Sequence, residues 1–245
     1  MGNSVYFHKV IKHKLANALL TVFFIVAFIE IIAEINEDKA LIWFTKPLLM
    51  PLLILYYIKR SHNSNIYFIL ALVFSWIANM FFIANTYQWI IYGSVFFLIY
   101  RFLIIYIVVK KVKTPGLLPA IIGCLPFIFI YFSVCFFTFK ELGVNIYIFL
   151  LHGVFVTILG GLSLGNFILS ASKSNFYLFI STMLFALTQF VFILKLFYSN
   201  GNLFHALAMV MFVFGQFFLT KFIFLTEKNR YNKYEIINDL KDSAI

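Results

Sequence analysis

The sequence predicts an all-α membrane protein, a bundle of about eight transmembrane helices with both termini in the cytoplasm. Hydrophobic residues make up 63% of the 245 residues and charged residues only 11%, against about 25% charged in an ordinary globular domain. The apolar residues fall into eight segments, each near the ~20 residues that a spanning helix needs. None of the segments has the two-residue alternation of a membrane barrel strand, so only helices can satisfy their backbone groups in lipid.

The first apolar segment, residues 15–35, follows a basic stretch, residues 1–14, that we expect in the cytoplasm. The segment is longer than the apolar core of a secretory signal, and the residues around Glu34 make a poor cleavage site. We therefore expect a retained helix. It carries Glu30 and Glu34 one turn apart on one face.

Seven further segments complete a membrane domain that we place over residues 15–225, followed by a cytoplasmic tail over residues 226–245. These segments are residues 41–58, 66–84, 89–109, 116–137, 144–168, 176–198 and 203–225. The second contains Lys46, Pro47 and Pro51. The sixth contains the run Gly160-Gly161-Leu162-Ser163-Leu164-Gly165, and such small residues favour close packing of helices in lipid.

The distribution of lysine and arginine predicts the orientation. With the amino terminus in the cytoplasm, thirteen of the 19 lysines and arginines fall at the cytoplasmic side and two, Lys39 and Lys140, at the outer side. Cytoplasmic loops carry an excess of these residues, so we expect both termini in the cytoplasm of a cell whose inner membrane holds the protein. The same distribution explains the net charge of +10 without a nucleic-acid partner.

Polar residues inside the apolar segments are the functional signal, because a charge at the centre of a spanning helix costs roughly 2.5–3.5 kcal/mol. Arg101 lies near the middle of the fourth segment and Gln216 near mid-depth in the eighth. In the outer half we expect Glu30, Glu34, Lys46, Asn79, His152 and Gln189. Their shared depth predicts one cavity that faces outward.

Each of these residues also has a structural interpretation. The amides Asn79, Gln189 and Gln216 are typical of hydrogen bonds between helices, and a single histidine such as His152 often has the same role. Arg101 could form an ion pair with Glu30 or Glu34. The segment position of His205 suggests the membrane interface, and the five histidines show no metal-ligand spacing, so we expect no metal and no cofactor.

Several motifs together resemble the YhhN-like, lysoplasmalogenase family of eight-helix membrane proteins. The most specific is Lys46-Pro47-Leu48-Leu49-Met50-Pro51-Leu52-Leu53. Phe74 through Asn79 resembles a third-helix motif, Gly93 through Arg101 a fourth-helix motif, Phe185 through Gln189 a seventh-helix motif, and Gly215-Gln216 the last helix. The resemblance covers nearly the whole chain and implies an eight-helix bundle.

The resemblance also implies hydrolysis of the vinyl ether bond of lysoplasmalogens to a fatty aldehyde and a glycerophospho-base. This chain departs from the family pattern, because Asn79 and Gln189 stand where the family tends to have aspartate. Arg101, or Tyr100 if the register shifts by one, stands where it tends to have histidine. Protonation of a vinyl ether needs a titrating proton donor, which an amide or a guanidinium cannot supply.

The remaining acids in the apolar segments are Glu30 and Glu34, and paired carboxylates can divide the acid and base roles of a hydrolysis. One hypothesis is therefore a membrane hydrolase of ether lysophospholipids that uses Glu34 or Glu30. The alternative is a non-catalytic relative that binds membrane lipids or holds a partner. A small transporter is a weaker interpretation, because paired broken helices in matching halves are not evident.

Overall fold

The computed structural model describes residues 2–61, 63–84, 86–142, 146–198 and 203–242; the side chains of residues 2–11, 134, 137–142, 146, 193, 195–198 and 229–242 lie outside this description. All regular structure in the described residues is helical. The helices are α1 (Gly2–Asn36), α2 (Lys39–Arg60), α3 (Ile66–Ile83), α4 (Tyr87–Lys111), α5 (Leu117–Leu142), α6 (Ile146–Leu169), α7 (Lys173–Tyr198) and α8 (Leu203–Asp242).

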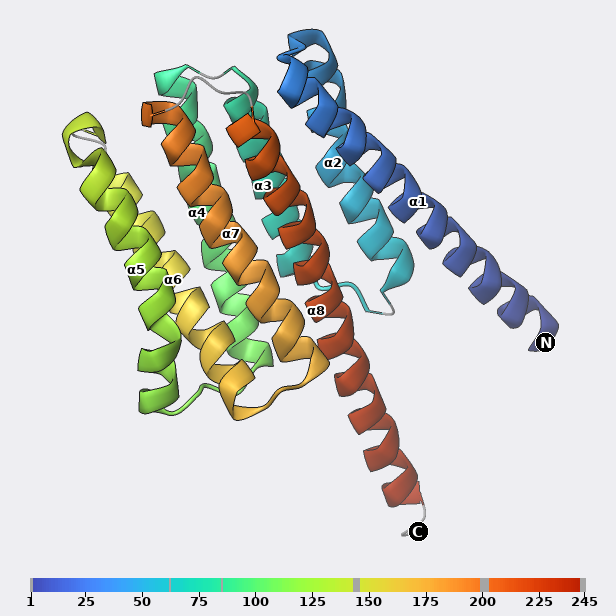
Figure 1. Cartoon of the computed structure of the whole chain (residues 1–245). Helices are drawn as coiled ribbons and strands as arrows, with labels where there is room; N and C mark the ends of the chain where they lie inside the picture. The colour runs from blue at the N-terminus through green and yellow to red at the C-terminus, as the bar shows by residue number, and fades with distance from the viewer. Residues whose placement is uncertain (1, 62, 85, 143–145, 199–202, 243–245) are drawn as a thin grey trace.

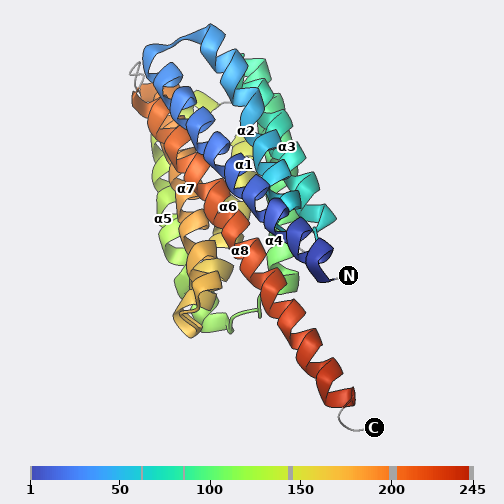
Figure 2. The same cartoon turned by 90° about the vertical axis from the view of Figure 1, so that its right-hand side faces the viewer.

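Consecutive helices form four antiparallel pairs, and the pairs stand side by side as a bundle (Figure 1). The α1–α2 and α5–α6 pairs lie at opposite sides of the bundle, with α3, α4, α7 and α8 between them. Helix α1 also packs against α8, α6 against α4, and α5 against α7. The amino and carboxyl ends lie at the same end of the bundle in both views (Figures 1 and 2).

The prediction of an all-helical membrane bundle is confirmed. Seven of the helices in the described residues are long and apolar enough to cross a membrane, and only α5 is missing from that set. The described apolar part of α5, Leu117–Ser133, is shorter. The protein is therefore an integral, multi-pass membrane protein, while the cytoplasmic location of its ends stays a prediction.

The first and last helices extend beyond the apolar segments that the sequence defines. Helix α1 begins at Gly2 rather than near residue 15, and α8 continues through the polar segment after residue 225 to Asp242. Residues 3–14 and 226–242 contain no glycine or proline, so nothing in the backbone ends either helix at the membrane boundary.

The turn between α1 and α2 is short and well defined. Glu37 adopts a left-handed conformation with φ of 53°, and the amide of Asp38 donates to the carbonyl oxygen of Ala33 over 3.0 Å. This pattern is a helix C-cap of the Schellman type. The Asp38 carboxylate then caps α2 by accepting from the amide of Leu41 over 3.1 Å. The turn fixes Glu34 in the last turn of α1, facing the start of α2.

The predicted close packing at the small-residue run is confirmed. A Cβ atom added to Gly123 of α5 would lie 2.7 Å from the carbonyl oxygen of Gly161 and 2.8 Å from the amide nitrogen of Gly165, both in α6. Such distances leave no room for a side chain, so the backbones of α5 and α6 are in direct contact.

Glu227 of α8 connects three helices at the end of the bundle that carries both termini. Its carboxylate accepts from Tyr57 Oη over 2.5 Å and from Ser61 Oγ over 2.9 Å, and lies 3.7 Å from Lys111 Nζ. These contacts connect α8 to the ends of α2 and α4. The opposite end of the bundle contains the main cavity.

Candidate functional site

A cavity of about 390 Å³ lies between α3, α4, α6, α7 and α8, with the end of α1 and the start of α2 at one side. This volume is within the roughly 300–1,000 Å³ usual for small-molecule sites. Six phenylalanines form most of its apolar wall: Phe82, Phe97, Phe149, Phe185, Phe192 and Phe212. The polar side chains that line it are Glu34, Lys46, Asn79, Ser94, Arg101, His152, Thr188, Gln189 and His205.

One side of the cavity holds a carboxylate–lysine cluster, formed by Glu30, Glu34 and Lys46. The Lys46 Nζ atom lies 2.5 Å from Glu34 Oε1 and 3.4 Å from Glu30 Oε1, so one ammonium group serves two carboxyl groups. The Thr45 hydroxyl donates to Glu30 Oε2, and His205 Nδ1 lies 3.6 Å from Glu34 Oε2. All three members of the cluster are buried, and Glu34 and Lys46 reach the cavity.

The other side of the cavity is formed around Arg101, which is only 5% exposed. Its Nη1 donates to the carbonyl oxygen of His152 over 3.3 Å, and its guanidinium carbon lies 5.1 Å from the centre of the Phe97 ring. No carboxylate among the described residues lies within ion-pair distance of Arg101. The alternative of a structural ion pair with Glu30 or Glu34 is therefore wrong.

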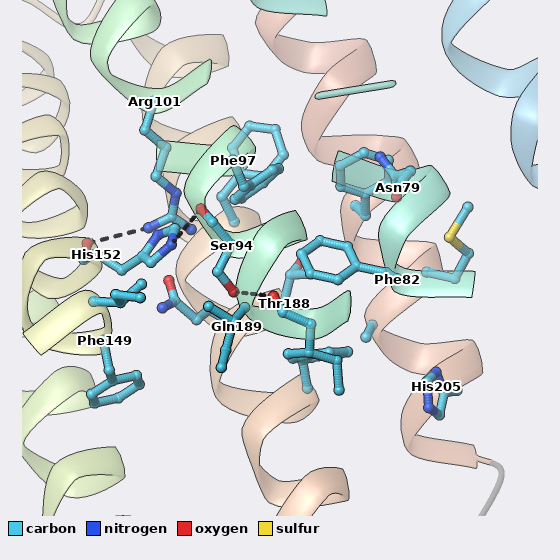
Figure 3. A pocket seen from close by; sticks show the side chains of 18 of the residues that line it. Asn79, Phe82, Ser94, Phe97, Arg101, Phe149, His152, Thr188, Gln189 and His205 are labelled. Carbon is cyan, nitrogen blue, oxygen red and sulfur yellow. Dashed lines mark hydrogen bonds between the residues drawn. The ribbon is translucent and has the colours of Figure 1, made fainter. Parts of the chain in front are cut away.

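His152 lies beside Arg101 with one ring nitrogen in a hydrogen bond and the other facing no protein partner (Figure 3). Its Nε2 is 3.0 Å from the carbonyl oxygen of Ser94, which can only accept, so the proton of this bond is on Nε2. The Nδ1 atom is buried and has no hydrogen-bond partner. In the neutral imidazole Nδ1 is an acceptor, available to a hydroxyl group in the cavity.

The two amides that line the cavity are anchored to the protein through their nitrogen atoms. Gln189 Nε2 donates to Tyr131 Oη over 3.0 Å, and Tyr131 donates to the carbonyl oxygen of Phe149. Asn79 Nδ2 donates to the carbonyl oxygen of Ser75 over 2.7 Å. Gln189 Oε1 is buried without a partner, so it is a second unused acceptor near Arg101.

Six of the residues predicted for the pocket or for catalysis line this one cavity: Glu34, Lys46, Asn79, Arg101, His152 and Gln189. Glu30 lies one turn before Glu34 in α1 and is connected to the cavity through Lys46. Gln216 also lies outside, in a hydrogen-bond chain in which it accepts from Tyr100 Oη over 3.3 Å and donates to Ser75 Oγ over 3.1 Å. Of the two positions for the fourth-helix motif, Arg101 lines the main cavity and Tyr100 does not.

Sequence reasoning missed His205 as a member of the site, because its place near the start of α8 suggested the membrane interface. The signal was present, since His205 is close to the start of α8 just as Glu34 is close to the end of α1, and the structure brings these two helix ends to the same end of the bundle. It also missed Ser94 and Tyr131. Ser94 contributes a backbone carbonyl, which no side-chain pattern can indicate, and Tyr131 acts through Gln189.

The chemistry that this arrangement offers is that of carboxyl, ammonium, imidazole and guanidinium groups in a largely apolar chamber. Within the described residues no group of three or more histidine, cysteine, aspartate or glutamate side chains has the geometry of a metal site. Figure 3 shows Arg101, His152 and Gln189 on one side of the pocket and Asn79 and His205 on the other. An elongated polar ligand could therefore contact both sides at once.

Comparison with known proteins gives one match. The model of the YhhN family matches residues 41–223, which is more than half of the chain and includes nearly all of α2, helices α3 to α7 and about the first half of α8. The matched range begins after α1, so Glu30 and Glu34 lie outside it. Searches of curated proteins and of solved structures found no match. Since the family model covers most of the chain, the protein belongs to the YhhN family.

Proposed function

We propose that this protein is a lysoplasmalogenase-type membrane hydrolase, which cleaves the vinyl ether bond of ether lysophospholipids to a fatty aldehyde and a glycerophospho-base. One observation carries the proposal: a carboxyl group, Glu34, and a guanidinium group, Arg101, line the same cavity between apolar walls. The first is the type of group that can protonate a vinyl ether, and the second is the type that holds a charged head group.

The carboxylate–lysine cluster can supply the proton. With Lys46 charged and both carboxyl groups ionised, the cluster carries one net negative charge in a buried site. One added proton, shared among Glu30, Glu34 and the adjacent His205, makes it neutral. A neutral cluster avoids the cost of an uncompensated buried charge, so the cluster holds one exchangeable proton, and Glu34 is the carboxyl group through which this proton reaches the cavity.

The reaction then follows the chemistry of an enol ether. Glu34 transfers a proton to the alkene carbon remote from the ether oxygen, which gives an oxocarbenium ion. Water adds to the carbon bonded to oxygen, and its proton returns to the Glu34 carboxylate. The resulting hemiacetal breaks its bond to the glycerol oxygen, which takes up the hydroxyl proton. The net reaction consumes one water and leaves the carboxyl group as it began.

Lys46 and Glu30 act as positioning residues in this scheme. Lys46 fixes the Glu34 carboxyl at the cavity surface through the 2.5 Å contact, and Glu30 with Thr45 fixes Lys46 from behind. The apolar wall also limits the access of bulk water. An oxocarbenium ion formed there is paired with the carboxylate that has just lost its proton.

The test is aldehyde release from a lysoplasmalogen by the purified protein in detergent or lipid nanodiscs. We expect wild-type turnover, and a loss of roughly 10²–10⁴-fold in kcat for Glu34→Gln, which keeps the shape and removes the titrating proton. The matched control is Glu37→Gln, since Glu37 is an exposed glutamate in the adjacent turn. Full activity in the Glu30→Gln, Glu34→Gln double variant would exclude this mechanism.

A second candidate function is lipid binding without turnover. The observation that favours it is the pair of amides, Asn79 and Gln189, at the cavity where the family tends to have aspartate. In this case wild-type protein would bind an ether lysophospholipid but release no aldehyde. Aldehyde release by the Asn79→Asp, Gln189→Asp variant alone would identify the protein as a relative that has lost its acids.

A further inference from the structure

We infer that Arg101 is the receptor for the phosphate of the ligand, and that the ligand presents a phosphodiester together with at least one neighbouring hydroxyl group. The inference deepens the proposed function and depends on it only for the assignment of the cavity as a lysophospholipid site. The juxtaposition that carries it is a buried guanidinium beside two buried, unpaired acceptors, His152 Nδ1 and Gln189 Oε1.

The first step concerns the charge of Arg101. A guanidinium remains protonated at any physiological pH, and a buried charge without a counter-ion costs several kcal/mol. Glu34 is the one carboxylate among the described lining residues, and it is already paired with Lys46. The protein therefore leaves the counter-charge of Arg101 to whatever occupies the cavity.

The second step concerns the hydrogen bonds of Arg101. The guanidinium has five N–H donors, and in the described structure only Nη1 has a protein acceptor, the carbonyl oxygen of His152. The Phe97 ring lies 5.1 Å from the guanidinium carbon and limits how this group can turn. A planar fork with free donors matches the geometry of phosphate oxygens, which accept two parallel N–H bonds.

The third step concerns the two acceptors. His152 uses Nε2 to bond Ser94, and Gln189 uses Nε2 to bond Tyr131, so each is fixed with its acceptor atom unpaired. A buried acceptor without a donor is costly, and a phosphodiester has no proton to give. A hydroxyl group on another part of the ligand can supply the donors. A glycerol hydroxyl next to the phosphate meets this requirement.

The charge count selects a diester over a monoester. With the carboxylate–lysine cluster neutral, the cavity carries the single positive charge of Arg101. The phosphate group of a diester brings one negative charge and balances the charge of Arg101, whereas the phosphate group of a monoester brings about 1.5 to 2 negative charges at pH 7 and leaves an excess. The phenylalanine walls then accommodate the first part of a hydrocarbon chain.

The experiment measures binding and not turnover. The probes are 1-O-hexadecyl-glycero-3-phosphocholine, whose saturated ether cannot react as a vinyl ether, and 1-O-hexadecylglycerol, which lacks the phosphate. Each is titrated against detergent-solubilised protein by equilibrium dialysis. We expect Arg101→Gln to weaken binding of the phosphocholine probe roughly ten- to hundred-fold and to leave binding of the glycerol ether unchanged. Arg60→Gln, at an exposed arginine outside the cavity, should change neither.

Arg101→Lys provides the second variant, because it keeps the charge and loses the fork. We expect its preference for the phosphocholine probe over the glycerol ether to lie between those of the wild type and Arg101→Gln. Because the two affinities are compared within one variant, any partial unfolding lowers both and cancels from their ratio. An unchanged preference in both variants, or an equal loss for both probes, would overturn the inference. Glycerophosphocholine and inorganic phosphate are then tested as competitors of the phosphocholine probe. Competition by glycerophosphocholine alone supports a diester from a soluble source. Competition by inorganic phosphate as strong as that of the lipid would contradict the inference of a diester.

This test separates the two proposals. If the Arg101 variants change the preference as expected while lysoplasmalogen yields no aldehyde, the proposal of a hydrolase is refuted and the proposal that Arg101 binds phosphate is supported. If aldehyde is released and the Arg101 variants keep the wild-type preference, the hydrolase stands and the phosphate receptor fails.

Discussion

The indole nitrogen of Trp76 in α3 donates to the carbonyl oxygen of Pro47 in α2 over 2.8 Å. This carbonyl is the one that Pro51 leaves without a donor, because proline has no N–H to offer four residues later in the helix. The sequence of α2 thus creates an unpaired carbonyl, and the sequence of α3 supplies its partner. The Lys46–Pro47 motif and the Trp76 motif are in this sense two halves of one structural element.

Trp76→Phe should lower the stability of the protein by about 1 kcal/mol, since it leaves the Pro47 carbonyl unpaired in the bundle. Thermal unfolding in detergent measures the change, and Trp89→Phe at a half-exposed tryptophan is the control. The cost should shrink in a Pro51→Ala background, where residue 51 again donates to Pro47. An equal cost in both backgrounds would show that this hydrogen bond is not the cause.

Lys46→Met should destabilise the protein by about 3–5 kcal/mol, because two buried carboxyl groups lose their shared counter-ion. Adding Glu34→Gln to this variant should recover part of the loss. Lys39→Met changes an exposed lysine of the same helix and should leave the unfolding temperature unchanged. A Lys46→Met protein as stable as this control would show that the cluster contributes no net stability.

The two glutamates should differ in their kinetic effects, although they lie one turn apart. Glu34 lines the cavity and Glu30 does not, so Glu30→Gln should lower kcat less than ten-fold while Glu34→Gln lowers it roughly 10²–10⁴-fold. Steady-state aldehyde release gives both values. An equal loss of kcat in the two variants would mean that Glu30 is itself the proton donor.

Placing carboxylates at the two amides of the cavity should raise activity. Asn79→Asp and Gln189→Asp each place an acid at the cavity surface, and we expect the double variant to exceed the wild-type rate of aldehyde release. Asn79→Asp gives up the donor that bonds the Ser75 carbonyl, so we expect a small loss of stability with it. A lower rate in both single variants, with the fold retained, would contradict the expected gain.

The orientation can be tested with reporters. A reporter fused after Ile245 should be cytoplasmic and one inserted at Lys140 should be external, in a protein that fractionates with the inner membrane. The reverse pattern would refute the topology and would place the cavity on the cytoplasmic side.

The sequence predicted the helices and the common level of several polar residues along them, because apolar segments and the positions of charges within them are read directly along the chain. It therefore placed Arg101, His152 and Gln189 in one cavity although they come from three different helices. Which of two residues one helical turn apart reaches the cavity was not predictable. Glu30 and Gln216 share a helix face with Glu34 and Phe212 but lie one turn below them.

The sequence also does not reveal which aromatic side chains line the cavity and which pack elsewhere in the bundle. Tyr100 is buried outside the lining of the cavity, and its hydroxyl donates to the side-chain amide oxygen of Gln216. Nearly every position in residues 89–109 of α4 and 203–225 of α8 is apolar, so no contrast along either segment indicates which aromatic side chains line the cavity. For the same reason the sequence could not show that no carboxylate of the described residues pairs with Arg101.

Helix α8 has 40 residues, a length of about 60 Å at 1.5 Å per residue, against a hydrocarbon core of about 30 Å. Its candidate span ends at Lys228, and the helix continues beyond the other helices to Asp242 (Figures 1 and 2). The last 14 residues thus form a rod of about 20 Å, more than twice the screening length of about 8 Å at physiological ionic strength. A protein that docks at the tip of this rod meets the ions of the bulk solution and not the field of the lipid head groups.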